Sequence, residues 1–586
     1  MDDKRNLIAA ILLSVAILIG WNFVAERFFP TPAQPDVTRT VAGANGAPAS
    51  APVAQGQPSP LPAPAATAPA APAAQAIRPV DVVLAEGQRI PIETPAIRGS
   101  INLTGARIDD ITLTKYRQTI KKDSPPVRLF APGGTPAAYF ASLGWAAQGI
   151  QVPGANTVWT ADGTKLTPTS PVTLSWANTT GQTFRIEYSI DANYLITAKQ
   201  TIANTGAAPV SASSFALIDR LGKPTDPHEV DSWTIHVGPT GYLDGKSVFD
   251  VDYDDVEEAA NRSVRYASAG WLGFTDKYWL AAIIPARGER VTAAISSPAA
   301  NNYQTLFARD FAEVAPGQQL TATSRIFAGA KEVEILETYQ NDQGITRLSN
   351  AIDWGWFEFF EVPIFKLLHW LFLQLGNFGL AIMALTLIIR LLMFPIANRQ
   401  FSSMAQMRVV QPKMKALQER YKDDKPKMQQ ELMKLYKDEK INPLAGCLPI
   451  LIQIPIFYAL YKVLMLAIEM RHQPFILWIK DLSAPDPLHI LNLFGLLPFT
   501  PPSILAIGLL AVILGVTMWL QFRLNPAPAD PVQAQVFKIM PWLFMFIMAP
   551  FAAGLLLYWI TNNILSIGQQ QWMYRKFPAL KAAPAK

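Results

Sequence analysis

An arginine inside an apolar run is the first feature of this sequence that could do chemistry. The segment ALTLIIRLLMFP, residues 384–395, holds Arg390 among aliphatic side chains. Arg390 lies six residues before the end of the run at Ile396, which is about 9 Å along a helix. An arginine stem can span most of that distance, so the residue either snorkels to water or marks a functional polar site.

Uncharged polar side chains accompany Arg390 in the apolar part of the chain. Thr386 lies four residues before Arg390 and therefore on the same helical face. Other apolar segments contribute amides and hydroxyls: Gln453, Thr517, Gln521, Thr561, Asn562, Asn563 and Ser566. These groups either line a shared wet cavity or form ordinary hydrogen bonds between helices. Since the expected spans after residue 376 contain no Asp or Glu, the counter-charge of Arg390 must come from water, lipid phosphate or a transiently bound molecule.

No pattern in the sequence predicts covalent catalysis or a metal centre. The stretch GYLDGKS, residues 241–247, resembles a phosphate-binding loop but has three residues between its glycines where that motif needs four. There is no nucleophile elbow and no H-E-x-x-H pattern. The five histidines lie outside the expected membrane spans, and Cys447 is the only cysteine. We therefore expect no catalytic residue, bound metal, cofactor or intrachain disulfide.

Composition indicates an integral membrane protein. Half of the 586 residues are hydrophobic and 16% are charged. The apolar residues gather in runs of about 18 or more, the length that spans hydrocarbon. Residues 397–441 carry eleven Lys or Arg against six Asp or Glu, whereas the stretch from about 80 to 350 has a net charge near −4. By the positive-inside rule the first stretch is cytoplasmic and the second is extracytoplasmic.

The N-terminal region predicts an anchor and a tether. Residues 1–5 are expected in the cytoplasm, and residues 6–24 form an apolar run that follows two basic residues and precedes no convincing cleavage site. We interpret this run as an uncleaved signal anchor. Residues 25–80 hold twelve prolines among many alanines, so they are expected to form an extended, disordered linker.

A large β-domain is expected next, over residues 81–350. Its clearest strand is TFRIEYSI, residues 183–190, in which apolar and polar side chains alternate. Further strand candidates are bounded by Gly, Pro or Asn, which favours a β-sandwich. The segment GAKEVEILETYQ, residues 329–340, predicts a helix that closes this domain.

After residue 350 the pattern becomes helical, and we expect six membrane spans including the anchor, with both termini in the cytoplasm. Charged residues among the aromatics of residues 354–376 favour a helix in the membrane interface. Lys462, near the outer end of its span, is expected to snorkel. The expected order is an interfacial helix at 351–376, spans at 377–396, 446–466, 503–522, 538–552 and 554–572, a cytoplasmic hairpin at 397–445, an extracytoplasmic loop at 467–502, a cytoplasmic loop at 523–537 and a cytoplasmic tail at 573–586.

The cytoplasmic hairpin is expected to contain two helices, at about 401–421 and 426–439, that end before Asn442-Pro443. Its methionines either form an adaptable binding face or pack the two helices together. They are Met404, Met407, Met414, Met428 and Met433.

Several segments in order resemble the YidC/Oxa/Alb family of membrane protein insertases. They are LTLIIRLLMFPIANRQFSSMAQMRVVQPKMKALQERYKDDK, INPLAGCLPILIQIPIFYALYKVL and APFAAGLLLYWITNNILSIGQQQWMYRK. The resemblance covers about residues 350–577 closely. With the anchor and the large domain, the whole arrangement is similar to the Gram-negative form, which implies a five-helix insertase core and a periplasmic β-supersandwich.

The resemblance also implies roles for particular residues. The family has a hydrophilic groove, open to the cytoplasm and to lipid, with an important arginine in its first core helix; Arg390 occupies that place. Thr386 matches a groove position, and Trp559 matches an aromatic of the last helix. Ile454 and Phe457 match the apolar slide of a substrate helix. From the residues themselves we add four candidates for the groove: Gln453, Thr517, Gln521 and Asn562.

The expected function is insertion and folding of integral proteins in a bacterial inner membrane, without covalent catalysis. The resemblance implies as partners nascent membrane proteins, the Sec translocon with its SecDF part, the signal recognition particle receptor, the ribosome and membrane lipids, with no specific nucleic acid. A solute transporter or channel is the main alternative, and an envelope enzyme whose β-domain carries the activity is the third. The lack of membrane carboxylates and of an inverted repeat weakens the transporter hypothesis.

Overall fold

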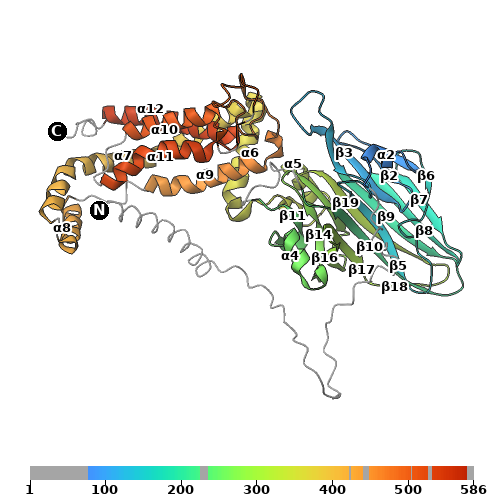
Figure 1. Ribbon diagram of the computed structural model, residues 1–586. Coiled ribbons are helices and arrows are strands. Elements are labelled where there is room, and N and C mark those ends of the chain that lie inside the picture. The colour runs from blue at the N-terminus through green and yellow to red at the C-terminus, as the bar shows by residue number, and fades with distance from the viewer. Residues whose placement is uncertain are drawn as a thin grey trace, which may run out of the picture. The chain divides into compact units, whose positions relative to one another are not determined.

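The computed structural model describes residues 77–224, 235–421, 424–439, 448–499, 501–502, 505–524 and 531–576 (Figure 1). The expected anchor at 6–24, nearly all of the linker at 25–80 and the last ten residues of the tail lie outside this part. The chain divides into two compact units, Met1–Gln57 with Asn525–Met540, and Pro58–Leu524 with Pro541–Lys586. The β-domain and the candidate site both lie in the second unit.

The β-domain contains two antiparallel sheets (Figure 1). The ten-stranded sheet follows the order β1 (Arg89–Glu93), β2 (Ile97–Asn102), β3 (Arg107–Arg117), β5 (Tyr139–Ala147), β10 (Val210–Leu221), β17 (Asn302–Arg309), β16 (Val291–Ala299) and β13 (Ser263–Tyr266), with β4 (Pro126–Phe130) on β3 and β18 (Ala312–Val314) on β10. The nine-stranded sheet follows β12 (Lys246–Val248), β11 (Gly238–Leu243), β14 (Ala269–Thr275), β15 (Trp279–Pro285), β19 (Gln319–Ala330), β9 (Leu195–Asn204), β8 (Gln182–Ile190), β7 (Val172–Ala177) and β6 (Thr160–Asp162).

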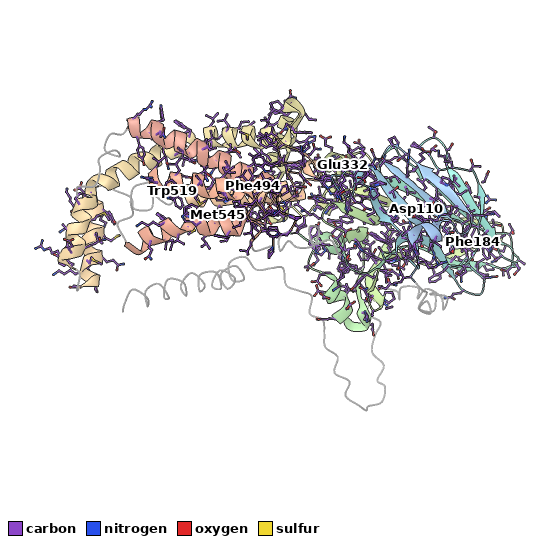
Figure 2. All side chains as sticks on the ribbon, turned by 45° about the horizontal axis from the view of Figure 1, so that its top comes forward. Asp110, Phe184, Glu332, Phe494, Trp519 and Met545 are labelled. Atoms are coloured by element: carbon purple, nitrogen blue, oxygen red, sulfur yellow. The ribbon has the colours of Figure 1, made fainter. Side chains whose placement is uncertain are left out.

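The prediction of a β-sandwich is confirmed, and β8 shows why it succeeded. Its side chains alternate between the buried and the exposed face, as the sequence pattern requires of a strand with one wet side. Phe184 on β8 lies edge-on to Trp145 of the other sheet, with ring centroids 6.3 Å apart (Figure 2). Gln200 on β9 also donates from Nε2 to the carbonyl of Gly144, at 3.0 Å. The two sheets therefore share one core.

The closing helix of the β-domain begins later than the sequence pattern indicated. We expected it at 329–340, whereas α5 spans Val333–Asn341. The first residues of the expected helix belong to β19, where Ala330 pairs with Trp279 of β15. Strand pairing across the sheet therefore overrides the local helical preference there. Two shorter helices, α2 (Val80–Leu84) and α4 (Tyr253–Glu258), complete the domain.

The C-terminal part is helical (Figure 1). Its helices are α6 (Glu358–Leu375), α7 (Phe378–Arg420), α8 (Lys425–Asp438), α9 (Leu448–Leu466), α10 (Leu509–Leu524), α11 (Pro531–Met548) and α12 (Ala553–Lys576). Helix α7 joins the expected span at 377–396 and the first expected hairpin helix into one helix of 43 residues. Two prolines, Pro395 and Pro412, lie inside this helix.

Close packing joins two of these helices. A Cβ on Gly515 of α10 would lie 3.3 Å from the Cβ of Met545 on α11, so the missing side chain leaves room for Met545. By length and composition, one helix in the described ranges, Phe378–Asn398 within α7, could cross a bilayer. The apolar helices Gln453–Leu466, Leu509–Leu524 and Gln535–Met548 are shorter. The arrangement of six spans thus stays a prediction.

Candidate functional site

Arg390 on α7 is held by two polar residues of α12. Its Nε donates to Oδ1 of Asn562 at 2.7 Å, and its Nη2 donates to Oγ of Ser566 at 2.6 Å and to the carbonyl of Asn562 at 3.4 Å. In the part of the chain that the structure describes, no carboxylate lies within ion-pair distance of this guanidinium. Neutral dipoles therefore stabilise the charge without cancelling it.

A polar stripe on α12 links three neighbouring helices. Asn562 and Ser566 are one turn apart and both face α7. Tyr558, one turn earlier, accepts a hydrogen bond on its hydroxyl from Nε2 of Gln453 on α9, at 2.7 Å. Asn563 donates from Nδ2 to Oγ1 of Thr517 on α10, at 3.2 Å. These polar pairs thus form hydrogen bonds between helices in this structure.

Two other expected groove residues behave differently. Thr386 is buried, and its hydroxyl donates to the carbonyl of Ile382 on its own helix at 2.7 Å, so its one proton is already engaged. Gln521 on α10 is half-buried and has no hydrogen bond to any described residue. Sequence reasoning passed over Tyr558, although its place four residues before Asn562 puts it on the same helical face.

Aromatic rings gather beside the polar stripe. Trp559 lies edge-on to Phe457 of α9, with ring centroids 5.0 Å apart, and 4.7 Å from Phe544 of α11. The indole Nε1 of Trp559 is buried without an acceptor among the described residues. Ile454, one turn before Phe457, is 57% exposed. The two expected slide residues thus form one apolar face of α9. Ile454 is exposed at one end of this face, and Phe457 contacts Trp559 at the other.

A charged cluster lies where α9 meets α6, and the sequence did not predict it. Lys462 is 2% exposed, and its Nζ lies 3.7 Å from a carboxylate oxygen of Asp353. The expectation that Lys462 snorkels is therefore wrong: a carboxylate partner inside the protein replaces water. Glu361 on α6 is fully buried, and neither carboxylate oxygen has a hydrogen-bond partner among the described residues. Burial raises the pKa of Glu361 to about 8, although nearby Lys462 acts to lower it.

The hairpin methionines divide between the two expected roles. Met414 is buried beside Val410 and packs against Leu432, Leu435 and Tyr436 of α8. Met433 is 57% exposed. At least one methionine thus packs the hairpin, and at least one is available to a partner. The side chains of Met404 and Met407 lie outside the described ones.

Family models cover nearly all of the β-domain and the helical part. The model of the YidC periplasmic domain matches residues 89–367, and the model of the 60Kd inner membrane protein matches residues 370–581. The protein named membrane protein insertase YidC in Zymomonas mobilis subsp. mobilis is 45% identical over 581 residues, which cover 98% of this chain and 96% of that protein.

This chain belongs to the YidC family. The YidC of Methylobacterium sp. is 43% identical over 604 residues, with 98% of this chain and 96% of that protein covered. A crystal structure of an active YidC insertase with its first transmembrane domain resolved aligns at 21% identity over 83% of this chain and 93% of that one, with a TM-score of 0.35. The resemblance that the sequence motifs indicated is confirmed, and every expected site residue lies within the second family match.

Proposed function

We propose that this chain is a multi-pass insertase of a bacterial inner membrane, which inserts integral membrane proteins and helps them to fold. Arg390 is the observation that carries this proposal: its guanidinium is bound by neutral acceptors of α12 and has no carboxylate partner among the described residues. A cation in that state retains its attraction for an incoming anion, because no internal ion pair must be broken first.

The proposed mechanism needs no covalent step. An acidic or polar segment of a nascent protein enters a groove lined by Arg390, Asn562 and Gln453, where it exchanges water for fixed dipoles and one positive charge. The apolar helix of the substrate then passes Phe457 and Ile454 into lipid. Its burial, at about 25 cal/mol per Å² of apolar surface, supplies the driving force without ATP.

We place the chain in the membrane by its charge bias. Six spans, with both termini in the cytoplasm, put the β-domain in the periplasm and the basic hairpin of α7 and α8 on the cytoplasmic side. The hairpin would receive nascent chains. The insertase would act alone or beside the Sec translocon and SecDF, with the signal recognition particle receptor and the ribosome as delivery partners.

Arg390→Ala tests the role of the charge. In vesicles that contain the full chain, the variant should insert a small protein with an acidic translocated tail about tenfold more slowly, a change of about 1.4 kcal/mol. The same substrate with amides in place of its carboxylates should be much less affected. Arg523→Ala removes an exposed cation at the end of α10 and is the matched control. If Arg390→Ala lowers the insertion rates of the acidic and the amide substrate by the same factor, the charge-pairing mechanism is excluded.

Photo-crosslinking tests the path of the substrate. A reactive side chain at Ile454, Phe457 or Trp559 should label a stalled nascent membrane protein, because these positions form the proposed apolar face. Leu373 on α6 is an apolar control whose exposure, 63%, is close to the 57% of Ile454. If Leu373 is labelled and none of the three other positions is, the groove proposal is wrong.

A further inference from the structure

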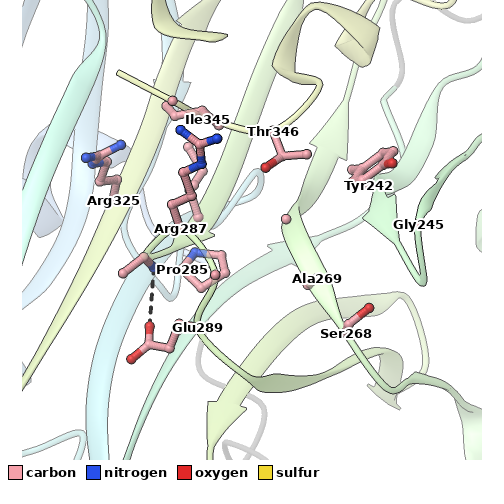
Figure 3. Close-up of a pocket in the computed structure, with 15 residues that line it drawn as sticks. Tyr242, Gly245, Ser268, Ala269, Pro285, Arg287, Glu289, Arg325, Ile345 and Thr346 are labelled. Carbon is pink, nitrogen blue, oxygen red and sulfur yellow. Dashed lines mark hydrogen bonds between the residues drawn. The ribbon is translucent and has the colours of Figure 1, made fainter. Parts of the chain in front are cut away.

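A pocket of about 280 Å³ lies in the β-domain, away from the candidate site (Figure 3). In this view Arg287 and Arg325 lie on one side of the pocket, and Tyr242 and Ser268 lie on the other. Gly270 keeps the space between them open, since a Cβ there would lie 3.2 Å from the ring of Tyr242. The volume suits a small headgroup or ester and is at the lower end of the range of ligand pockets.

The two arginines give the pocket a positive side. Arg287 is exposed and has no hydrogen bond or ion pair to any described residue. Arg325 donates from Nη1 to the carbonyl of Gln343 at 2.9 Å, which leaves its charge uncancelled. The pocket carboxylate, Glu289, is already engaged, because both of its oxygens accept from Arg309 at 2.7 Å. One of those oxygens also accepts from the amide of Ala286 (Figure 3).

The remaining polar groups of the pocket are hydroxyls. Thr346 and Tyr242 line the pocket, and each carries a hydroxyl that can donate or accept. Ser268 is less available, because its hydroxyl and its amide both donate to Asp244 at the edge of the pocket. Two guanidiniums and two hydroxyls match the several acceptor oxygens of a phosphate better than the two oxygens of a carboxylate.

The location of the pocket indicates where such a phosphate would come from. Thr346 precedes the start of α6, the expected interfacial helix, by twelve residues. The segment between them stays close to the pocket, since Asn350 donates from Nδ2 to Oγ of Ser247 at 2.9 Å. Ser247 lies on β12, next to pocket residue Gly245. In the proposed orientation, the pocket is therefore near the outer leaflet, where phospholipid headgroups are concentrated.

We propose that this pocket binds a phosphate ester through Arg287 and Arg325, and that its source is the headgroup of an anionic phospholipid. The site would bind the β-domain to the membrane surface beside α6. The choice of a lipid rests on the proposed orientation of the β-domain, whereas phosphate binding itself does not depend on insertion activity.

Hydrogen–deuterium exchange of the full chain in neutral detergent tests the proposal. Dihexanoyl phosphatidylglycerol should slow amide exchange in peptides that cover residues 268–270 and 343–346. The double variant Arg287→Gln, Arg325→Gln should raise the half-saturating concentration of this lipid at least tenfold. Arg185→Gln with Arg265→Gln, two exposed arginines of the same domain outside the pocket, should change it less than twofold. Unchanged exchange in β5, which holds none of the substituted residues, would show that the variants remain folded.

Two further probes identify the source. Dihexanoyl glycerol lacks the phosphate and should give no protection. If glycerol 3-phosphate protects the pocket as well as the lipid does, a free phosphate ester is the ligand and the lipid assignment is wrong. If no phosphate compound gives protection, or if dihexanoyl glycerol protects equally, the pocket is not a phosphate site.

Discussion

Arg390 differs from the buried arginines of the β-domain in how its charge is held. Arg220 is paired with Asp276 at 2.9 Å, and Arg309 is paired with Glu289 at 2.7 Å. In both pairs an opposite charge nearby offsets part of the cost of desolvating the arginine. Arg390 has only amide, hydroxyl and carbonyl acceptors among the described residues. This difference is the physical reason for assigning it a role with an external anion.

Asn562→Asp should abolish that role while the protein stays folded. The new carboxylate would replace the amide oxygen that lies 2.7 Å from Nε of Arg390 and would form an internal ion pair. We expect insertion of acidic-tailed substrates to fall about as far as in Arg390→Ala, with an unchanged or higher melting temperature. Asn562→Ala, which removes the acceptor and leaves the charge, is the control and should remain more active. Full activity of Asn562→Asp would contradict the assignment.

Lys462 should be needed for stability. Lys462→Met would leave Asp353 without its cation and Glu361 without the nearest positive charge. Loss of one partner of a buried pair typically destabilises a protein by about 3 kcal/mol. Addition of Asp353→Asn should restore part of the loss, as measured by chemical denaturation in detergent. If Lys462→Met alone were neutral, the buried pair would have no structural importance.

At the scale of elements, α6 should make stability depend on pH. The pKa of Glu361 is raised from 4.5 to about 8 by burial, so the folded protein keeps this proton where the unfolded chain releases it. The folded state then binds more protons between these two values, so the contribution of Glu361 to stability is fully present below pH 4.5 and is lost as pH rises to about 8. One proton limits the slope to about 1.4 kcal/mol per pH unit.

Glu361→Gln should flatten that dependence, because a neutral amide replaces a group that must otherwise stay protonated. Melting temperatures at pH 6 and pH 8 should converge in this variant and differ in the parent chain. Glu358→Gln, on the exposed side of the same helix, is the control and should behave like the parent. The same pH dependence in Glu361→Gln and in the parent would show that another group is responsible.

At the scale of the whole molecule, the β-domain should be dispensable for insertion. Helix α5 should be kept, because Glu337 lies 2.9 Å from Lys366 of α6 and Glu334 lies 3.6 Å from His369 of the same helix. Deletion of residues 81–330 ends at the last residue of β19 and keeps the residues that make these contacts. Vesicles with this variant should insert substrates within about twofold of the parent rate, whereas deletion to residue 341 should lower the melting temperature. Complete loss of function on the first deletion would favour an activity within the β-domain.

The sequence by itself determined the features that depend on local pattern. Alternation in β8 predicted a strand with one buried face, and apolar runs and charge bias predicted the class of protein and its orientation. The same runs marked Arg390 as exceptional, and the motifs around it indicated the family. Each of these signals is contained in neighbouring residues, so it needs no knowledge of what packs against them.

Only the tertiary structure decided which groups meet. Asn562 lies 172 residues from Arg390 in the chain, and Asp353 lies more than 100 residues from Lys462. Helix ends also depended on such contacts, as at Ala330, where pairing with β15 replaces the expected helix. The burial of Glu361 and the presence of Arg287 and Arg325 in one pocket likewise have no local signal. Hydrogen bonds and desolvation act through space, so the partner of a charge is fixed by packing and not by spacing.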